Sequence, residues 1–169
     1  RLYCELGPSD PALSSDVSAR GTDLLLKGLG DFLGKTTSRI DHLVVVGDGD
    51  VTLGAVLIDL ITGMKRFKVP VAVISNGTRL NRPEVRDALA GADMVMLSLD
   101  AVAPEVYKKI CRPLSLDIPS PGELIKHFAA FSVMFGGELC LMTVLVAGLN
   151  DRPEHLMALK EAVNRIKPR

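Results

Sequence analysis

Residues 42–64 read HLVVVGDGDVTLGAVLIDLITGM and carry the clearest fold signal in the chain. A short run rich in β-branched residues, typical of a buried strand, is followed by a glycine-rich turn and then by apolar residues at helical spacing. The apolar helical face consists of Leu53, Val56, Leu57, Leu60, Ile61 and Met64. This stretch therefore predicts a strand, a tight turn and a helix that packs on the sheet.

The same unit recurs along the chain. Apolar runs over 42–47, 71–77, 94–100 and 139–148 predict four strands, and a helical stretch follows each of them. The runs lack strict alternation of polar residues, which is typical of parallel strands covered on both faces. The sequence therefore predicts an α/β fold with a parallel sheet.

Local signals indicate where the remaining helices begin and end. Pro83 and Gly91 bound one helix, and a loop over 7–20 leads into another over 24–33. The letters SPGE at 120–123 form a capping box, in which the serine and glutamate side chains bind free backbone N–H groups, so a helix runs to about residue 131. The letters DRPE at 151–154 predict a second capping box, at the start of the last helix. The last helix should then bury Leu156, Leu159, Val163 and Ile166.

Composition limits the function classes. The 169 residues suit one domain over 1–169, and 20 basic residues balance 20 acidic ones, which gives no support for nucleic-acid or membrane binding. Three scattered cysteines favour a reducing, cytoplasmic location, and no apolar run approaches the ~20 residues of a spanning helix. Because Arg1 is not a start methionine and the chain stops where a further strand could follow, we expect a fragment.

Polar residues follow three consecutive predicted strands. Each group alone is explained about equally well by an ordinary turn or a helix cap. Together they predict one small-molecule rim, because the carboxyl ends of parallel strands meet at one edge. The rim residues are Gly47, Asp48, Gly49, Asp50 and Thr52 after the first strand, Ser75, Asn76, Gly77 and Thr78 after the second, and Ser98 and Asp100 after the third.

Other chemistry-bearing residues give weaker signals. Cys4 lies outside any predicted strand or helix and could ligate a metal or cluster, whereas Cys140, within the fourth strand, is expected to be buried and Cys111 could be exposed. The three histidines show no metal-ligand spacing. The sequence contains no G-x-S-x-G, G-x-x-x-x-G-K-[ST] or G-x-G-x-x-G motif, which disfavours hydrolase triads, P-loop NTPases and typical dinucleotide folds.

Taken together, the motifs resemble those of radical S-adenosylmethionine enzymes, nearest to the branch of wyosine-type tRNA synthetases and related Fe–S oxidoreductases. The resemblance covers nearly the whole chain. Its pieces are Tyr3-Cys4-Glu5-Leu6-Gly7, residues 47–53, 71–78 and 92–101, Arg112-Pro113, and Gly148-Leu149-Asn150-Asp151.

The resemblance implies a partial (β/α) barrel that binds a [4Fe–4S] cluster and S-adenosylmethionine and generates a 5′-deoxyadenosyl radical, with an electron donor as partner. By this resemblance Cys4 is the third cluster ligand and Tyr3 packs near the adenine. Residues 47–50 meet the methionine amino group, and Ser75, Asn76, Ser98 and Asp100 approach the ribose and carboxylate. The substrate is not implied; RNA enters only by family analogy.

Two departures from the family pattern bear on activity. Its C-x-x-x-C-x-x-C motif requires cysteine at position 1, where this chain has Arg1, and a guanidinium cannot replace a thiolate on iron. Asp50 and Val51 stand where the family usually has glutamate and proline. We therefore expect a chain that is inactive by itself, and two alternatives stay open: a cluster-less binding or structural module, and an unrelated α/β-barrel lyase, which the absence of a strand lysine weakens.

Overall fold

The computed structural model describes residues 1–4, 19–47, 50–53, 56–113 and 118–169, which contain one parallel sheet of four strands. The strands are β1 (Leu43–Val45), β2 (Val71–Ser75), β3 (Met94–Ser98) and β4 (Glu138–Met142). One row of paired residues crosses the sheet from Val45 through Val73 and Val95 to Leu139. The predicted α/β fold with parallel strands is confirmed.

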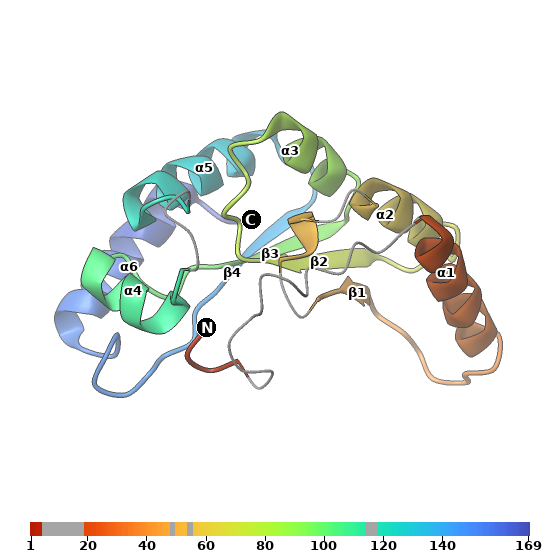
Figure 1. The fold of residues 1–169 in the computed structure, drawn as a ribbon, viewed down its shortest axis with the longest axis horizontal. Helices are drawn as coiled ribbons and strands as arrows, with labels where there is room; N and C mark the ends of the chain where they lie inside the picture. Colours follow the sequence, from red (N-terminus) through yellow and green to blue (C-terminus); the bar gives the residue numbers. More distant parts are fainter. Residues whose placement is uncertain (5–18, 48–49, 54–55, 114–117) are drawn as a thin grey trace.

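The spatial order of the strands equals their order in the chain, β1-β2-β3-β4. A doubly wound sheet reverses its strand order at a switch point, whereas a (β/α) barrel adds each strand beside the previous one. Figure 1 shows α1, α2, α3 and α5 arching over the same face of this sheet. The topology is therefore that of a partial (β/α) barrel.

In β1, the residues on one face of the sheet are buried by helices, whereas the residue on the other face is exposed. Leu43 and Val45 of β1 are buried on the helical side, while Val44 between them keeps 48% of its surface exposed. The expectation that both faces are covered is therefore wrong for β1 in the described part of the chain. The apolar character of Val44 had suggested burial, but strand alternation turns its side chain away from the helices.

The helices match the sequence predictions with three differences. Their bounds are α1 (Ala19–Leu33), a 3₁₀ turn η2 (Val51–Leu53), α2 (Leu57–Lys65), α3 (Pro83–Ala90), α4 (Pro104–Cys111), α5 (Pro121–Met134) and α6 (Pro153–Ile166). The helix predicted from Leu53 begins only at Leu57, and α1 begins earlier than residue 24. The crossover between β3 and β4 holds α4 as well as α5. Most of the loop predicted over 7–20 falls outside the described residues.

The two predicted capping boxes have different outcomes. Ser120 forms the predicted one: its backbone N–H donates to Glu123 Oε2 over 2.8 Å, and its Oγ accepts from the Glu123 backbone N–H over 3.4 Å. Asp151 does not cap α6, because its Oδ1 accepts from Gly148 N–H at 2.9 Å and Arg152 is the N-cap residue. Asp151 therefore closes the preceding turn.

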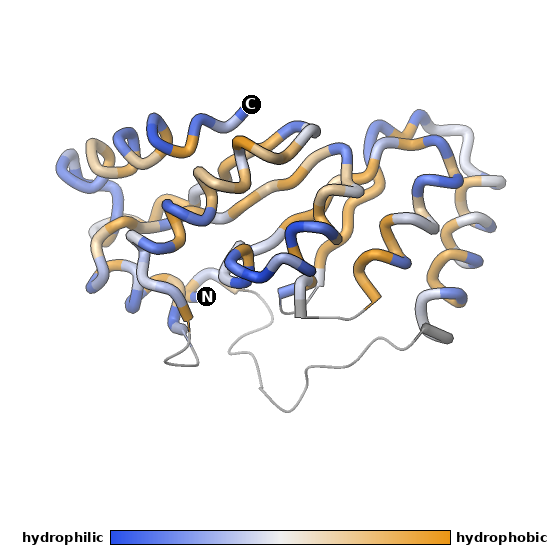
Figure 2. The backbone as a smooth tube through the Cα atoms, turned by 90° about the horizontal axis from the view of Figure 1, so that it is seen from above, coloured by the Kyte–Doolittle hydropathy of each residue, from blue (hydrophilic) through white to orange (hydrophobic). Residues whose placement is uncertain are grey.

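The core lies between the sheet and the helices. Figure 2 shows apolar strands running beneath helices whose other faces are hydrophilic. On α6, Leu159, Ala162 and Ile166 are buried, but Leu156 and Val163 are 42% and 36% exposed, so the predicted buried face was wrong for these two. The buried stripe on α6 is narrower than the apolar pattern suggested. No helix among the described residues is long and apolar enough to cross a membrane.

Candidate functional site

The carboxyl ends of β1 and β2 are joined through Asp50. Its Oδ1 accepts hydrogen bonds from Ser75 Oγ at 2.9 Å and from the Thr52 backbone N–H at 3.1 Å. Its Oδ2 lies 3.4 Å from Thr78 Oγ1, a long contact. Asp50 is only partly buried. One oxygen is thus fixed in the protein and the other is held loosely enough to accept a ligand donor.

The turn after β2 supports this carboxylate. Ser75 Oγ accepts from the Gly77 backbone N–H at 3.0 Å while donating to Asp50. Asn76 Oδ1 accepts from the backbone N–H and the hydroxyl of Thr78, at 2.9 and 2.8 Å. Gly77 has φ +69°, a left-handed conformation that favours glycine. The predicted turn therefore also directs the Ser75 hydroxyl to the Asp50 carboxylate, while the Thr78 hydroxyl donates to Asn76 within the turn.

A second group forms at the end of β3 around Asp100. Its Oδ2 accepts from the Tyr3 hydroxyl at 2.7 Å and from the Arg1 guanidinium at 2.8 Å, and Arg1 also donates to Tyr3. Its Oδ1 accepts from the Val144 backbone N–H at 3.0 Å. Cys111 Sγ lies 4.0 Å from the same carboxylate. The N-terminal segment is thereby brought to the carboxyl edge of the sheet, beside the rim.

Asn150 fixes the backbone of this second group. It is fully buried, and its Nδ2 donates to the Asp100 carbonyl at 2.7 Å and to the Val144 carbonyl at 2.9 Å. Its Oδ1 accepts from the Val146 backbone N–H. Sequence reasoning did not assign Asn150 to the site. The available signal was its place in the turn Gly148-Leu149-Asn150-Asp151.

The described site residues thus form two groups at neighbouring strand ends. Ser75 pairs with Leu97, so Ser98 lies one residue farther along the same edge, buried at the end of β3. Within the described ranges, no hydrogen bond connects the Asp50 group to the Asp100 group. Gly47 is exposed at the end of the described part of the first strand, and Asp48 and Gly49 lie outside the described residues.

Thr52 adds a buried polar atom to the first group. Its side chain is buried, and its Oγ1 has no hydrogen-bond partner among the described residues, although its backbone N–H is bound by Asp50. A buried hydroxyl without a partner costs free energy. Thr52 Oγ1 therefore has hydrogen-bonding capacity that the described residues leave unused.

Burial and charge raise several pKa values around Asp100. Burial, then the hydrogen bond to Asp100, raises the pKa of Tyr3 to about 12. Burial, then the negative charge of Asp100, raises the pKa of Cys111 to about 11. Both groups are therefore protonated at neutral pH, and the expectation of an exposed Cys111 gives way to a half-buried thiol.

The cysteines do not gather. Cys4 is half-buried in the turn that carries Tyr3, and Cys140 is also only partly buried, with Sγ 3.6 Å from Glu138 Oε1, so its predicted burial was wrong. In the part of the chain that the structure describes, no group of three or more Cys, His, Asp or Glu side chains could hold a metal. The residues present, with one cysteine at position 4 and a guanidinium at Arg1, do not fit a [4Fe–4S] cluster by themselves.

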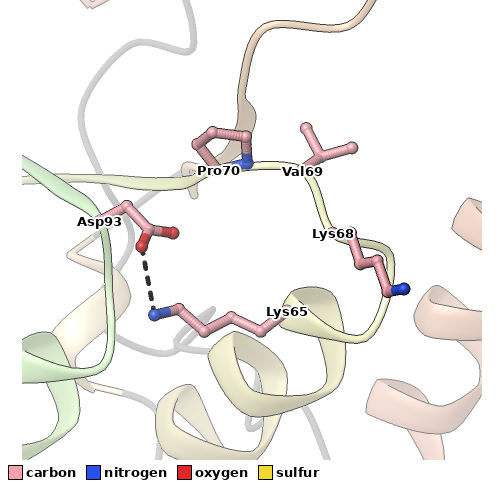
Figure 3. Close-up of a pocket in the computed structure, with 5 residues that line it drawn as sticks. All are labelled: Lys65, Lys68, Val69, Pro70 and Asp93. Atoms are coloured by element: carbon pink, nitrogen blue, oxygen red, sulfur yellow. Dashed lines mark ion pairs between the residues drawn. The ribbon is translucent and has the colours of Figure 1, made fainter.

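A shallow pocket lies at the opposite edge of the sheet. Lys65, Lys68, Val69, Pro70 and Asp93 line it, and Lys65 Nζ lies 3.2 Å from Asp93 Oδ1 (Figure 3). Pro70 and Asp93 immediately precede β2 and β3, so the pocket is at the amino ends of the strands. In (β/α) barrels that end contributes to stability, while the carboxyl ends carry function. The pocket is therefore separate from the candidate site.

Comparison with known sequences gives relatives over nearly the full chain. A "UPF0026 protein" of Helicobacter pylori is 29% identical over 98% of this chain and 53% of its own length. A protein of Brachyspira hyodysenteriae named "GTPase Obg" is 31% identical over 99% of this chain but 24% of its own length. A "Probable GTP 3',8-cyclase" of Thermococcus kodakarensis is 30% identical over 61% of this chain and 32% of its own length. No family model matches the chain.

Solved structures supply the fold comparison. An archaeal TYW1 structure covers 96% of this chain and 57% of its own, with TM-score 0.58 and 16% identity. Streptococcus suis SuiB bound to its precursor peptide SuiA covers 86% of this chain and 30% of its own, with TM-score 0.65 and 15% identity. Both are radical S-adenosylmethionine enzymes. The chain has the radical S-adenosylmethionine core fold.

This radical S-adenosylmethionine fold confirms the resemblance drawn from the sequence, including the presence of TYW1 among similar structures. At these identities the structural likeness concerns the fold. The chain spans about half the length of the Helicobacter pylori relative and less of the other two. What the whole proteins do therefore reaches this chain only as a proposal.

Proposed function

We propose that the rim binds S-adenosylmethionine and that the chain is the core of a radical S-adenosylmethionine enzyme, which generates a 5′-deoxyadenosyl radical for a substrate not yet known. The observation that carries the proposal is the contact of Asp50 with Ser75 and Thr78, which forms one polar rim across two strand ends. A solved structure of SuiB, with TM-score 0.56 to this chain, is titled as bound to S-adenosylmethionine.

The chemistry of the first group suits this ligand. S-adenosylmethionine carries an ammonium and a sulfonium, and a partly exposed carboxylate with one loosely held oxygen can accept from the ammonium. Asp50 Oδ2 is such an oxygen, because its contact within the described residues, with Thr78 Oγ1, is 3.4 Å long. Ser75, Asn76 and Ser98 would lie nearest the ribose and carboxylate, and Thr52 Oγ1 would gain the partner it lacks within the described chain.

The iron–sulfur part of the proposal requires more thiolates than this chain supplies. Cys4 would be one ligand, and a [4Fe–4S] cluster with an open iron needs two others. Position 1, where the family motif has cysteine, holds Arg1, which pairs with Asp100. Radical formation and its electron donor are therefore proposed for a longer protein that carries this fold and the missing cysteines.

A second candidate is a cluster-less binding module. The Arg1 guanidinium donates to Asp100 and lies 5.8 Å from the centre of the Tyr3 ring, so a cation packs beside Tyr3. A positive charge there can compensate the buried carboxylate without iron. In contrast, a Schiff-base lyase receives no support, because none of the described strands contains a lysine.

The first experiment measures ligand binding by titration calorimetry with S-adenosylmethionine. We expect saturable binding to the 169-residue chain and at least about tenfold weaker binding to Asp50→Asn, which loses the negative charge that faces the ammonium. Asp59→Asn, an exposed change on α2, is the matched control and should bind as the unchanged chain does. Equal affinity of all three proteins, or no binding at all, would count against the rim.

The second experiment separates the enzyme from the module. Anaerobic incubation with iron and sulfide, then a reductant and S-adenosylmethionine, is followed by iron–sulfur absorbance and by release of 5′-deoxyadenosine. A longer protein with the full cysteine motif should give both signals, and Cys4→Ala in it should abolish the cluster while leaving helical content unchanged. Ligand binding without cluster or product would favour the module.

A further inference from the structure

Asp100 has the most completely engaged carboxylate of the site. Its side chain is 1% exposed, and both oxygens are occupied: Oδ1 by the Val144 backbone N–H, Oδ2 by the Tyr3 hydroxyl and Arg1. Burying a carboxylate is costly unless its hydrogen-bond capacity is filled. The cost is offset here by donors from two separate parts of the chain, the N-terminal residues Arg1 and Tyr3 and the backbone of Val144.

The backbone around Asp100 is fixed as well. Asn150 Nδ2 donates to its carbonyl at 2.7 Å. The preceding Leu99 donates its N–H to the Met142 carbonyl at 2.9 Å, and its own carbonyl accepts from Thr143 Oγ1 at 2.8 Å. Asp100 is therefore a rigid point where the ends of β3 and β4 meet.

The segment that contains Cys4 is attached to this point. Leu2 N–H donates to the Ile110 carbonyl at the end of α4 over 2.7 Å, and the next residue, Tyr3, donates its hydroxyl to Asp100. Cys4 follows directly, in a turn closed by its N–H on the Arg1 carbonyl at 3.2 Å. Two attachment points on consecutive residues thus determine where the thiol lies relative to the sheet.

We propose that Asp100 is a positioning residue, which holds Tyr3 and thereby fixes Cys4 at the carboxyl edge of β3, rather than a direct contact of the ligand. The contrast with Asp50 supports this: Asp50 is partly exposed and has one loosely held oxygen, whereas the Asp100 side chain is 1% exposed and both of its oxygens already accept hydrogen bonds from the protein. The purpose of this arrangement rests on the proposed function, but the attachment itself does not.

The test measures the alkylation rate of each cysteine in the 169-residue chain with iodoacetamide, resolved by peptide mass spectrometry. Tyr3→Phe keeps the ring and the charge of Asp100 and removes only the hydroxyl. We expect this substitution to increase the alkylation rate of Cys4 by about five- to tenfold. The loss of one charge-assisted hydrogen bond should shift the opening equilibrium of the N-terminal segment by that factor and so expose the thiol more often. Cys140, on β4, is the internal reference and should keep its rate.

Tyr107→Phe is the matched control. It makes the same chemical change on α4, and within the described residues the Tyr107 hydroxyl makes no hydrogen bond to Asp100. Its Cys4 rate should equal that of the unchanged chain. An unchanged Cys4 rate in Tyr3→Phe, or an equal rise in Tyr107→Phe, would overturn the proposal.

A double-mutant cycle distinguishes positioning from a general loss of structure. If the Tyr3–Asp100 bond is the cause, Asp100→Ala, which removes both acceptor oxygens, should speed Cys4 alkylation, and adding Tyr3→Phe should change the rate no further, because the bond is already lost. Additive effects with a matching rise at Cys140 would mean global loosening and would refute the role. Since no S-adenosylmethionine or iron is present, failure here leaves the ligand titration untouched, and failure of that titration leaves this result intact.

Discussion

Ser75 Oγ donates to Asp50 Oδ1 over 2.9 Å and so connects the ends of two neighbouring strands that are 25 residues apart in sequence. The same Oγ accepts the Gly77 N–H, so one hydroxyl serves both the turn and the carboxylate. A parallel sheet brings these ends to one edge, and the hydrogen bond sets how the edge is shaped.

Replacing Ser75 tests this connection. Ser75→Ala leaves the buried Gly77 N–H without its acceptor and removes one of the two donors to Asp50 Oδ1, so it should lower the free energy of unfolding by about 1–3 kcal/mol and weaken S-adenosylmethionine binding. Urea unfolding and ligand titration measure the two effects. The exposed Ser38→Ala should change neither, and a stable Ser75→Ala protein with full affinity would show that the connection is dispensable.

Gly77 is predicted to accept no side chain. Its φ is +69°, and a Cβ there would lie 2.3 Å from Phe128 Cε1 in the core. Gly77→Ala should therefore cost about 2–4 kcal/mol from the left-handed backbone and the displaced ring. The control is Gly28→Ala in α1, where a Cβ meets nothing within 4 Å and helix propensity predicts a gain of about 0.5–1 kcal/mol. Thermal unfolding of both variants measures the two changes in stability. Similar melting temperatures for Gly77→Ala and Gly28→Ala would contradict the prediction.

Asn150 must donate as well as accept. Asn150→Asp keeps the shape but places carboxylate oxygens against the Asp100 and Val144 carbonyls, so about 3 kcal/mol or more of stability should be lost at neutral pH. The exposed Asn164→Asp on α6 makes the same chemical change and should stay within about 0.5 kcal/mol of the unchanged chain. Chemical denaturation at neutral pH compares them; equal losses would mean that the Asn150 amide is not the cause.

The carboxyl group of Asp93 should make the free energy of unfolding depend on pH. The Val71 backbone N–H, and then Lys65, lower the pKa of its carboxyl below the usual value. A group with a lowered folded pKa stabilises the fold above its unfolded pKa of about 3.9 and loses that contribution as the pH falls through the folded pKa. Asp93→Asn should therefore be less stable than the unchanged chain at pH 6, with the difference shrinking below about pH 4.

The size of the Asp93 effect should be small. Lys65 and Asp93 are both nearly half-exposed, so solvent screens their pair and the difference should stay below about 1 kcal/mol. Asp41→Asn, which breaks the more exposed pair with Arg39, should change stability by about 0.5 kcal/mol at most. A pH-independent gap between Asp93→Asn and the unchanged chain would rule out the ionised carboxylate as its source.

The sequence predicted the fold well where local chemistry decides it. The four strands, the helix between Pro83 and Gly91 and the capping box of Ser120 and Glu123 each depend on residues close in sequence, and each is present, although the fourth strand, predicted over 139–148, ends at Met142. One prediction failed although the contact is local: Asp151 was expected to cap α6, but its carboxylate accepts from the Gly148 N–H three residues earlier. The other failure depends on packing in space, because Leu156 and Val163 lie outside the stripe that the core covers.

The sequence by itself determined a parallel α/β fold and the three strand ends that carry polar groups, because hydrophobic periodicity and turn chemistry are local properties. Only the tertiary structure divided those polar groups into two sets. Asp50 remains partly open beside Ser75, while Asp100 is buried and bound to Tyr3, 97 residues away in sequence. Burial and long-range hydrogen bonds depend on which elements pack together. The difference in burial and hydrogen bonding between these two carboxylates could therefore not be inferred from sequence spacing alone.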